Sequence, residues 1–207
     1  MKTPIRILIA DDHTVVRTGL GALIDTIPGM TVVGEACNGD EAVCMAVKLK
    51  PDVIIMDLMM PKKDGAAATE ELHRLAPETR VLLLTSFATS DGISRAIDAG
   101  ATGAVMKDSP NNVLIDAIRT VASGGEAISA EIKRLIASDP PVQSLTPRQE
   151  EVLQSMMRGL TNKDIARQLS ISEDRVEQHV RTLLTKLGAA NRTEAVALAF
   201  RKHLLKI

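Results

Sequence analysis

Five polar residues each stand directly after a short apolar run, and their types could handle a phosphoryl group. Asp11 and Asp12 follow one such run, and Asp57, Thr85 and Lys107 each follow another. Three carboxylates in one place repel one another unless a cation compensates, and a hard divalent ion with oxygen ligands suits them best. A lysine and a hydroxyl complement an anion such as a phosphoryl group. If the five residues meet, they predict magnesium-assisted phosphoryl chemistry with a carboxylate as the acceptor.

The apolar runs alternate with amphipathic stretches over the first part of the chain. The expected strands span residues 5–10, 31–35, 53–56, 80–84 and 103–106, and the expected helices span 14–27, 39–49, 66–75, 91–99 and 111–123. Five strands that alternate with five helices predict an α/β domain whose parallel sheet is covered on both faces. Ligands of such sheets bind beyond the carboxyl ends of the strands, where the five polar residues are expected to converge.

Each of these residues also has an ordinary explanation when it is taken alone. Asp12 could cap the helix that follows it, and a single lysine after a strand is usually solvated. The five residues, however, follow four different strands at the same edge of the expected sheet. Coincidence is improbable for the whole set, and we expect one binding site at that edge.

The pattern changes after Ser144, where strands give way to four short helices. Thr146 and Pro147 form a helix start signal, with Glu150 near the third helical position. Ser170 and Ile171 form a short turn between the second and third helices, which is typical of a helix-turn-helix that enters the major groove of DNA. The four helices are expected at residues 147–158, 162–169, 173–187 and 193–205. The predicted organisation is a first domain over 1–124, a linker over 125–143 with a short helical piece at 130–137, and an all-α domain over 144–207.

Composition limits the function classes. The chain of 207 residues is 45% hydrophobic and 25% charged, which is typical of a globular protein and excludes a disordered chain. Residues 1–140 hold 14 Lys and Arg against 19 Asp and Glu, whereas residues 141–207 hold 11 against 7. The basic second half favours, weakly, a polyanionic partner. No apolar run reaches the length of a membrane helix, and Cys37 and Cys44 form no disulfide framework, so we expect a cytoplasmic protein with no membrane partner.

The first domain contains four short sequence motifs that include the five polar residues: Ala10-Asp11-Asp12-His13, residues 56–65, Leu84-Thr85-Ser86 and Met106-Lys107. Over about residues 1–122 the chain resembles a two-component receiver domain. The resemblance implies a five-stranded flavodoxin-like (βα)5 fold in which Asp57 accepts a phosphoryl group from a sensor histidine kinase. It also implies that Asp12 and Asp57 hold Mg²⁺ together with the backbone carbonyl of Met59, while Asp11 acts through water. Thr85 would hydrogen-bond the aspartyl phosphate, and Lys107 would pair with it.

Two features set this domain apart within the resemblance. The family usually carries a switch aromatic three residues before the lysine, and this position is Ala104. Transmission through rotation of an aromatic ring is therefore not expected here. Met59 and Phe87 stand two residues after Asp57 and Thr85, positions that flank the path of the hydrolytic water in receivers generally. Because both side chains are bulky and apolar, the phosphorylated form is expected to be long-lived.

The second domain carries five runs, at residues 145–153, 159–166, 176–181, 186–188 and 191–195. These runs are similar to the LuxR/FixJ-type output domain of NarL-family response regulators, over about residues 144–207. The similarity implies that a dimer binds a bacterial promoter. The similarity also implies which residues face the bases, namely Glu177, Gln178 and Arg181. The residues that it implies as phosphate contacts, which position the protein without reading the sequence, are Thr161, Asn162, Lys163, Arg175 and Lys186.

Glu177 departs from this family, in which the position is normally basic. A carboxylate in the groove is repelled by phosphate, although it can accept a hydrogen bond from cytosine N4. We expect either a low affinity for DNA or an unusual operator.

The predicted function is that of a two-component response regulator, a transcription factor rather than an enzyme, which dimerises on phosphorylation and binds promoter DNA. One alternative is an enzyme or nucleotide binder of the same fold, which would need a phosphate-cradling glycine loop, and the sequence contains none. The other is an atypical regulator that works unphosphorylated, as a protein-interaction module or a constitutive DNA binder. Ala104 and Glu177 favour this second alternative, whereas the intact strand-end residues count against it.

Overall fold

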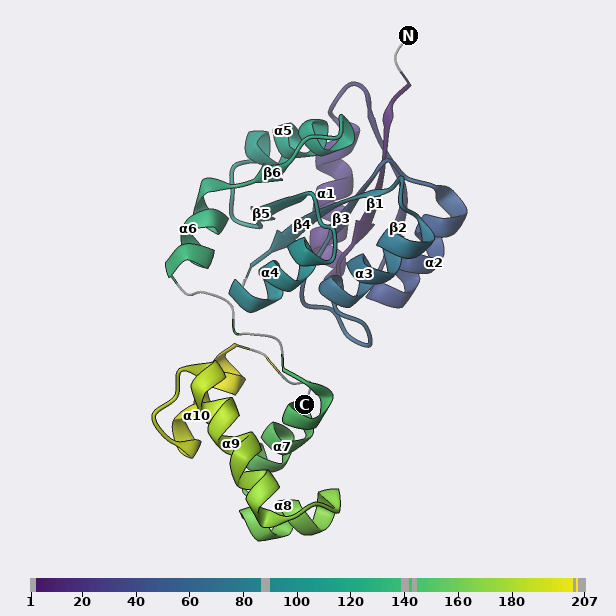
Figure 1. Ribbon diagram of the computed structural model, residues 1–207. Coiled ribbons are helices and arrows are strands. Elements are labelled where there is room, and N and C mark those ends of the chain that lie inside the picture. Colours follow the sequence, from purple (N-terminus) through teal and green to yellow (C-terminus); the bar gives the residue numbers. More distant parts are fainter. Residues whose placement is uncertain (1–2, 87–89, 139–141, 143–144, 203, 205–207) are drawn as a thin grey trace. The chain divides into compact units, whose positions relative to one another are not determined.

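A computed structural model of the chain describes residues 3–86, 90–138, 142, 145–202 and 204. The chain divides into two compact units, Met1–Asp139 and Pro140–Ile207 (Figure 1). Within the described ranges, no helix combines the length and the apolar character that crossing a membrane requires.

The first unit is built on a parallel sheet with the strand order β2-β1-β3-β4-β5-β6. Its strands are β1 (Ile5–Ala10), β2 (Met30–Ala36), β3 (Val53–Met56), β4 (Arg80–Thr85), β5 (Gly103–Met106) and β6 (Ala127–Ile128). The chain runs from β1 outward to β2, then crosses to β3 on the other side of β1 and continues outward from there. The strand order therefore reverses between β1 and β3, which is where ligands bind in open α/β sheets.

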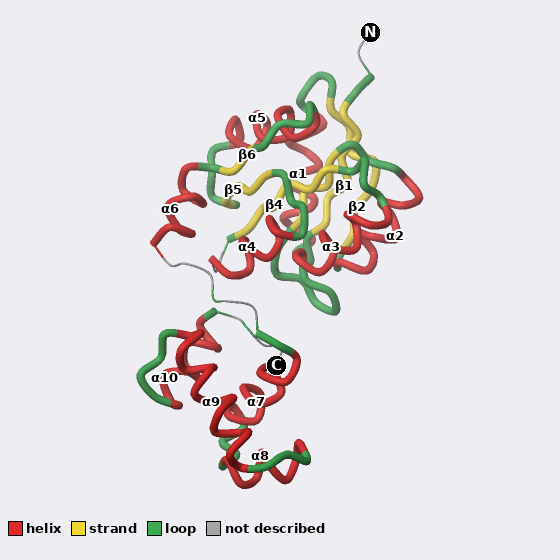
Figure 2. Tube along the Cα trace, in the orientation of Figure 1, coloured by secondary structure: helices red, strands yellow, loops and turns green. Residues whose placement is uncertain are grey.

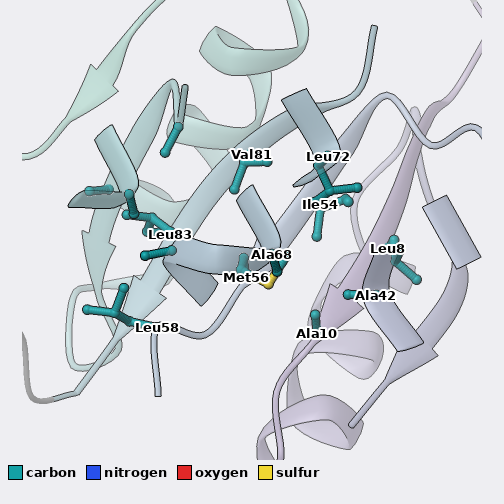
Figure 3. Close-up of a cluster of buried hydrophobic side chains, with 14 of the residues drawn as sticks. Leu8, Ala10, Ala42, Ile54, Met56, Leu58, Ala68, Leu72, Val81 and Leu83 are labelled. Carbon is teal, nitrogen blue, oxygen red and sulfur yellow. The ribbon is translucent and has the colours of Figure 1, made fainter. Parts of the chain in front are cut away.

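Helices cover both faces of this sheet (Figure 2). They are α1 (Thr14–Asp25), α2 (Gly39–Leu49), α3 (Gly65–Leu75), α4 (Ser90–Asp98), α5 (Asn111–Ala122) and α6 (Ala130–Ser138). Successive strand residues point to opposite faces, so Ile7 and Ile9 pack with α1 and α5, whereas Leu8 and Ala10 pack on the α2 and α3 side. Figure 3 shows this second cluster, in which Ile54, Met56 and Leu83 of the central strands meet Ala42, Ala68 and Leu72 of the helices.

The segment assigned to a linker from sequence contains ordered structure that belongs to the first unit. β6 pairs with β5 and adds a sixth strand to the five expected, with Ala104 opposite Ile128. The helix expected at 130–137 is α6, which packs on α4 and β5 and buries Ile132 completely. The first unit therefore extends to about residue 139, past residue 124, and the boundary falls within the segment expected as a linker. Two residues of strand and one short amphipathic helix give a weak signal in sequence, because their stability comes from the sheet on which they pack.

The second unit consists of four helices, α7 (Pro147–Met157), α8 (Asn162–Leu169), α9 (Glu173–Leu187) and α10 (Arg192–Arg201). Its core gathers Val152, Ile165, Val176, Leu183 and Ala195, one or more from each helix. The start signal at Thr146 is a capping box, but its partner at the third helical position is Gln149 rather than Glu150. The last helix ends at Arg201, before the end at residue 205 that was expected, since Lys202 and Leu204 are not helical. Residues 203 and 205 of the expected helix lie outside the described residues.

Candidate functional site

Asp11 and Asp57 lie side by side where the strand order reverses. The Asp57 N–H donates to the Ala10 carbonyl at 2.7 Å, which brings the end of β3 against the end of β1. The side chains of Asp11, Asp12, His13 and Asp57 each offer a ligand atom, and these atoms lie within 4.8 Å of one another. Asp11 and Asp57 are buried, whereas Asp12 and His13 are exposed. The predicted carboxylate cluster is therefore present, and its buried members face the sheet edge.

The first helix begins without a carboxylate cap. Its N-cap is His13, whose side chain makes no capping hydrogen bond, and so Asp12 is not the cap that it could have been. Asp11 instead accepts the His13 N–H at 2.8 Å, and the His13 Nδ1 lies 2.7 Å from Asp12 Oδ1. Sequence reasoning did not place His13 in the site, although it directly follows the two aspartates.

Lys107 supplies the positive charge of the site. Its Nζ lies 2.6 Å from Asp11 Oδ2 and 3.2 Å from Asp57 Oδ2, so one ammonium joins the two buried carboxylates. Burial lowers the pKa of Lys107, but the hydrogen bond to Asp11 and the charges of Asp57 and Asp11 outweigh that effect and raise the pKa overall. The ammonium is thus held in its charged form against the carboxylates.

Burial raises the pKa of Asp57 above its ordinary value, since the residue is only 4% exposed. The Lys107 charge acts in the opposite direction and Asp11 adds to the rise, while the Met59 N–H donates to the Asp57 carboxylate and lowers its pKa slightly. One ammonium does not balance three aspartates, so the oxygen-rich cluster fits a hard divalent cation. Asp11, Asp12 and Asp57 are the residues that could hold such an ion.

The loop after β3 is anchored at its far end. Lys63 pairs with Asp40 at 2.7 Å and with Glu71, and the carbonyl of Lys63 accepts the Gly39 N–H at 3.2 Å. Gly65 begins α3 against the backbone of Asp57, where any Cβ would overlap the Asp57 carbonyl oxygen. These contacts fix the segment that carries Met59, whose side chain is 46% exposed.

Thr85 ends β4 next to β5. It is 1% exposed, and among the described residues nothing hydrogen-bonds its Oγ1. Its carbonyl accepts the Lys107 N–H at 2.9 Å, which places the residue beside the lysine that completes the cluster. A buried hydroxyl without a partner is unfavourable unless a further group completes it.

Ala104 occupies the position at which receivers usually carry an aromatic residue, and it is fully buried. Its carbonyl accepts the Ser129 N–H at 3.0 Å, and the Ser129 Oγ accepts the Ile132 N–H at 3.3 Å. Ala104 and Ile132 belong to one cluster of buried side chains. The small side chain of Ala104 therefore allows α6 to pack directly on β5.

Replacing Ala104 with tyrosine is expected to lower the free energy of unfolding of the first unit by about 1–3 kcal/mol, because a ring must displace side chains from a filled core. Urea unfolding followed by circular dichroism measures the change. Ala22→Tyr, at an exposed position of α1, is the control and should shift the free energy of unfolding by less than about 0.5 kcal/mol. Equal unfolding midpoints for the two variants would contradict the conclusion that the packing of α6 on β5 leaves no room for a ring at position 104.

Side-chain caps begin both helices of the predicted helix-turn-helix. Thr161 Oγ1 accepts the Asp164 N–H at the start of α8, and Ser172 Oγ accepts the Arg175 N–H at the start of α9. Ser170, in the left-handed conformation, ends α8 and turns the chain into α9. Val176, Leu183 and Leu187 bury one side of α9. The opposite side is exposed and carries the predicted base-facing residues Glu177, Gln178 and Arg181.

The predicted phosphate contacts differ in their surroundings. Thr161, Lys163 and Arg175 are exposed, whereas Asn162 and Lys186 are half-buried. Lys186 Nζ donates to Gln149 Oε1 at 3.0 Å, so it supports the cap of α7. Sequence reasoning missed this role of Gln149, which the Thr-x-x-Gln pattern of a capping box could have indicated.

Arg192 is a second residue whose role sequence reasoning missed. Its Nη1 donates to Asn162 Oδ1 at 3.0 Å and its Nη2 donates to the Leu160 carbonyl at 2.5 Å, which ties α10 to the start of α8. Burial lowers the pKa of the Arg192 guanidinium. The contact joins segments that are 30 residues apart, and no local pattern indicates it.

Comparisons with known proteins agree with both units. Residues 7–119 match the response regulator receiver domain family, and residues 143–199 match the luxR family of bacterial regulatory proteins. The transcriptional regulatory protein LiaR of Bacillus subtilis is 37% identical over 209 residues, which cover 97% of this chain and 99% of LiaR. The response regulator VraR of Staphylococcus aureus is 35% identical over 207 residues, which cover 98% of this chain and 99% of VraR.

Solved structures show the same likeness. The response regulator ChrA of a heme-sensing two-component system matches with a TM-score of 0.60 and 35% identity, over 99% of this chain and 100% of ChrA. A complex of the response regulator RcsB with DNA matches with a TM-score of 0.69 and 25% identity, over 96% of this chain and 99% of RcsB. A receiver domain followed by a luxR-family domain, shared with relatives over nearly the whole length, identifies the chain as a member of the LuxR-type two-component response regulators, which are DNA-binding transcription regulators.

Proposed function

We propose that Asp57 accepts a phosphoryl group from the phosphohistidine of a sensor histidine kinase. A carboxylate oxygen of Asp57 attacks phosphorus, and the bond from phosphorus to the imidazole nitrogen breaks, with its electron pair returning to nitrogen. The observation that carries the proposal is the Lys107 ammonium between Asp11 and Asp57, because it stands where the oxygens of an acyl phosphate would need a countercharge. The buried Thr85 hydroxyl supports the proposal as a donor available for those oxygens.

We propose Mg²⁺ as the cation of this site, held by Asp12, Asp57 and the Met59 carbonyl, with Asp11 acting through water. When bound, the ion neutralises the developing charge on the phosphoryl oxygens. Asp12 is the most accessible of the three carboxylates and so the easiest to reach from solvent. Lys107 keeps the two buried carboxylates from repelling each other before the ion binds.

A long lifetime of the phosphorylated form remains a proposal that rests on Met59. Its apolar side chain offers no hydrogen bond to an attacking water, and it lies on the loop that Lys63 and Gly65 hold in place. Phe87, the other residue of the predicted pair, lies outside the described residues.

The phosphorylated protein is proposed to dimerise and to bind promoter DNA through α9. The experiment that tests this coupling is a mass measurement by size exclusion with light scattering, with and without beryllofluoride plus Mg²⁺. A shift from monomer to dimer on addition supports the phosphorylation site and its coupling together. DNA binding under the same two conditions is measured by fluorescence anisotropy. Equal binding in both conditions, with no change in mass, would favour the phosphorylation-independent regulator instead.

Lys163 provides a matched test of the DNA interface. Replacing this exposed lysine with alanine is expected to weaken binding to all DNA sequences and to reduce the slope of log K against log salt by about one unit. Fluorescence anisotropy at several salt concentrations measures both quantities. Lys133→Ala, at an exposed position of the first unit, is the control and should leave the slope unchanged. Identical slopes for wild type and Lys163→Ala would remove Lys163 from the interface.

A further inference from the structure

Two of the predicted base-facing residues of α9 are paired with each other. Arg181 Nη2 donates to Glu177 Oε1 at 2.6 Å, one helical turn away. Both side chains are largely in solvent, 77% exposed for Arg181 and 52% for Glu177. Exposed pairs of this kind add little to the stability of a fold. The pair lies on the side of α9 opposite Val176 and Leu183, so the packing of the unit does not depend on it.

The pairing leaves both side chains able to contact bases. A guanidinium carries five N–H groups, and one hydrogen bond to Glu177 leaves enough of them for a bidentate contact with O6 and N7 of guanine. The carboxylate limits the directions that the arginine can adopt, which lowers the entropy cost of forming that contact. The second oxygen of Glu177 remains available as an acceptor.

The carboxylate also has a preference of its own. In the major groove the amino groups of cytosine (N4) and adenine (N6) are the hydrogen-bond donors that a carboxylate can accept from. Adenine carries the N7 acceptor beside its amino group, and guanine and thymine show acceptor atoms, so the carboxylate prefers cytosine. A basic residue at position 177 would prefer the opposite set. The Glu177 carboxylate is thus both an attractive group for one base and a repulsive group for others.

We propose that Glu177 and Arg181 read DNA as one unit, in which Arg181 contacts guanine and Glu177 fixes the arginine and selects cytosine at a neighbouring base pair. Glu177 is then a specificity-determining residue rather than a defect of the recognition helix. The inference rests on the proposed binding of DNA through α9, and it names what that helix recognises.

The test uses the full chain and a library of duplexes with a randomised segment. Duplexes selected by the wild-type protein at low ionic strength give the preferred sequence, and competition binding then measures the preference at each position. Arg181→Ala is expected to lower the preference for guanine at one position by about 10-fold to 100-fold. Glu177→Gln is expected to lower the preference for cytosine at a neighbouring position and, in addition, to weaken the guanine preference. At the guanine position the double variant should lose little more discrimination than Arg181→Ala alone, because Glu177 acts there only through the arginine.

Glu173→Gln is the control, since it removes the same charge from an exposed position one turn earlier on α9. It should leave the base preferences unchanged. Because it removes a negative charge, it should raise the affinity for all sequences equally. If Glu177→Gln changes affinity for every sequence equally and alters no base preference, Glu177 acts only through its charge and the inference is wrong, although DNA binding by α9 stands. Additive losses of the guanine preference in the double variant would also overturn it. A wild-type protein with no salt-dependent binding to DNA would overturn the proposed function together with the inference.

Discussion

Replacing Asp57 with alanine is expected to abolish labelling of the protein by acetyl phosphate. Asp57 is buried at the end of β3, touches Lys107 and lies beside the Thr85 strand. Asp11 is also buried against Lys107, but it follows β1, which is not a neighbour of the Thr85 strand. Labelling is measured on a phosphate-affinity gel at fixed Mg²⁺, with thermal unfolding to check that the variant is folded. Removal of a buried charged group should not by itself unfold the domain, because burial already disfavours the charged form of Asp57.

Asp116→Ala is the matched control, because this aspartate is exposed on α5 and pairs only at 3.5 Å with Arg119. It should be labelled as well as the wild type. Asp11→Asn and Asp12→Asn retain the acceptor and should instead raise the Mg²⁺ concentration at which labelling is half-maximal. Full labelling of Asp57→Ala would show that another residue is the acceptor and would contradict the proposed reaction.

Replacing Arg192 with alanine is expected to lower the free energy of unfolding of the second unit by about 2–3 kcal/mol. The guanidinium makes two hydrogen bonds, and its removal leaves Asn162 Oδ1 and the Leu160 carbonyl without these donors. Hydrogen bonds that involve a charged group contribute about 1.5–3 kcal/mol, and a half-buried position falls within that range rather than above it. For a unit of this size the loss corresponds to roughly 10–20 °C in Tm.

Calorimetry measures this change on the full chain, as a shift of the transition that belongs to the second unit. Arg192→Lys keeps the positive charge but not the planar fork, so it should recover only part of the loss. Arg201→Ala removes an exposed arginine from the same helix and should leave Tm nearly unchanged. The idea fails if Arg192→Ala unfolds at the wild-type temperature.

The sequence alone determined the elements of both units and the edge of the sheet at which chemistry occurs. The alternation of Ile7 and Ile9 with Leu8 and Ala10 predicts a strand covered on both faces, and the structure confirms it. Asp11, Asp57 and Lys107 follow strands whose ends must meet at one edge of a parallel sheet, and the structure brings them into contact. The caps at Thr161 and Ser172 are equally local, since each hydroxyl accepts the N–H of the residue three positions later. Signals of this kind can be read from sequence because each depends on residues a few positions apart or on a strict repeat.

Only the tertiary structure decided which polar groups find partners and where the first unit ends. Residues 125–143 were expected to form a linker with a short helix and no strand, but β6 pairs with β5, and α6 packs on α4 and β5 with Ile132 in the same buried cluster as Ala104. The hydrogen bonds of Arg192 to Asn162 and Leu160 join α10 to α8, and the sequence between them carries no trace of the contact. Glu177 and Arg181 are four residues apart, a spacing that permits an ion pair on a helix. The spacing does not show whether the two side chains adopt the rotamers that pair them or remain solvated. Local patterns fix the elements because local interactions form them, whereas these partners lie far apart in the chain or depend on side-chain conformation, and packing brings them together.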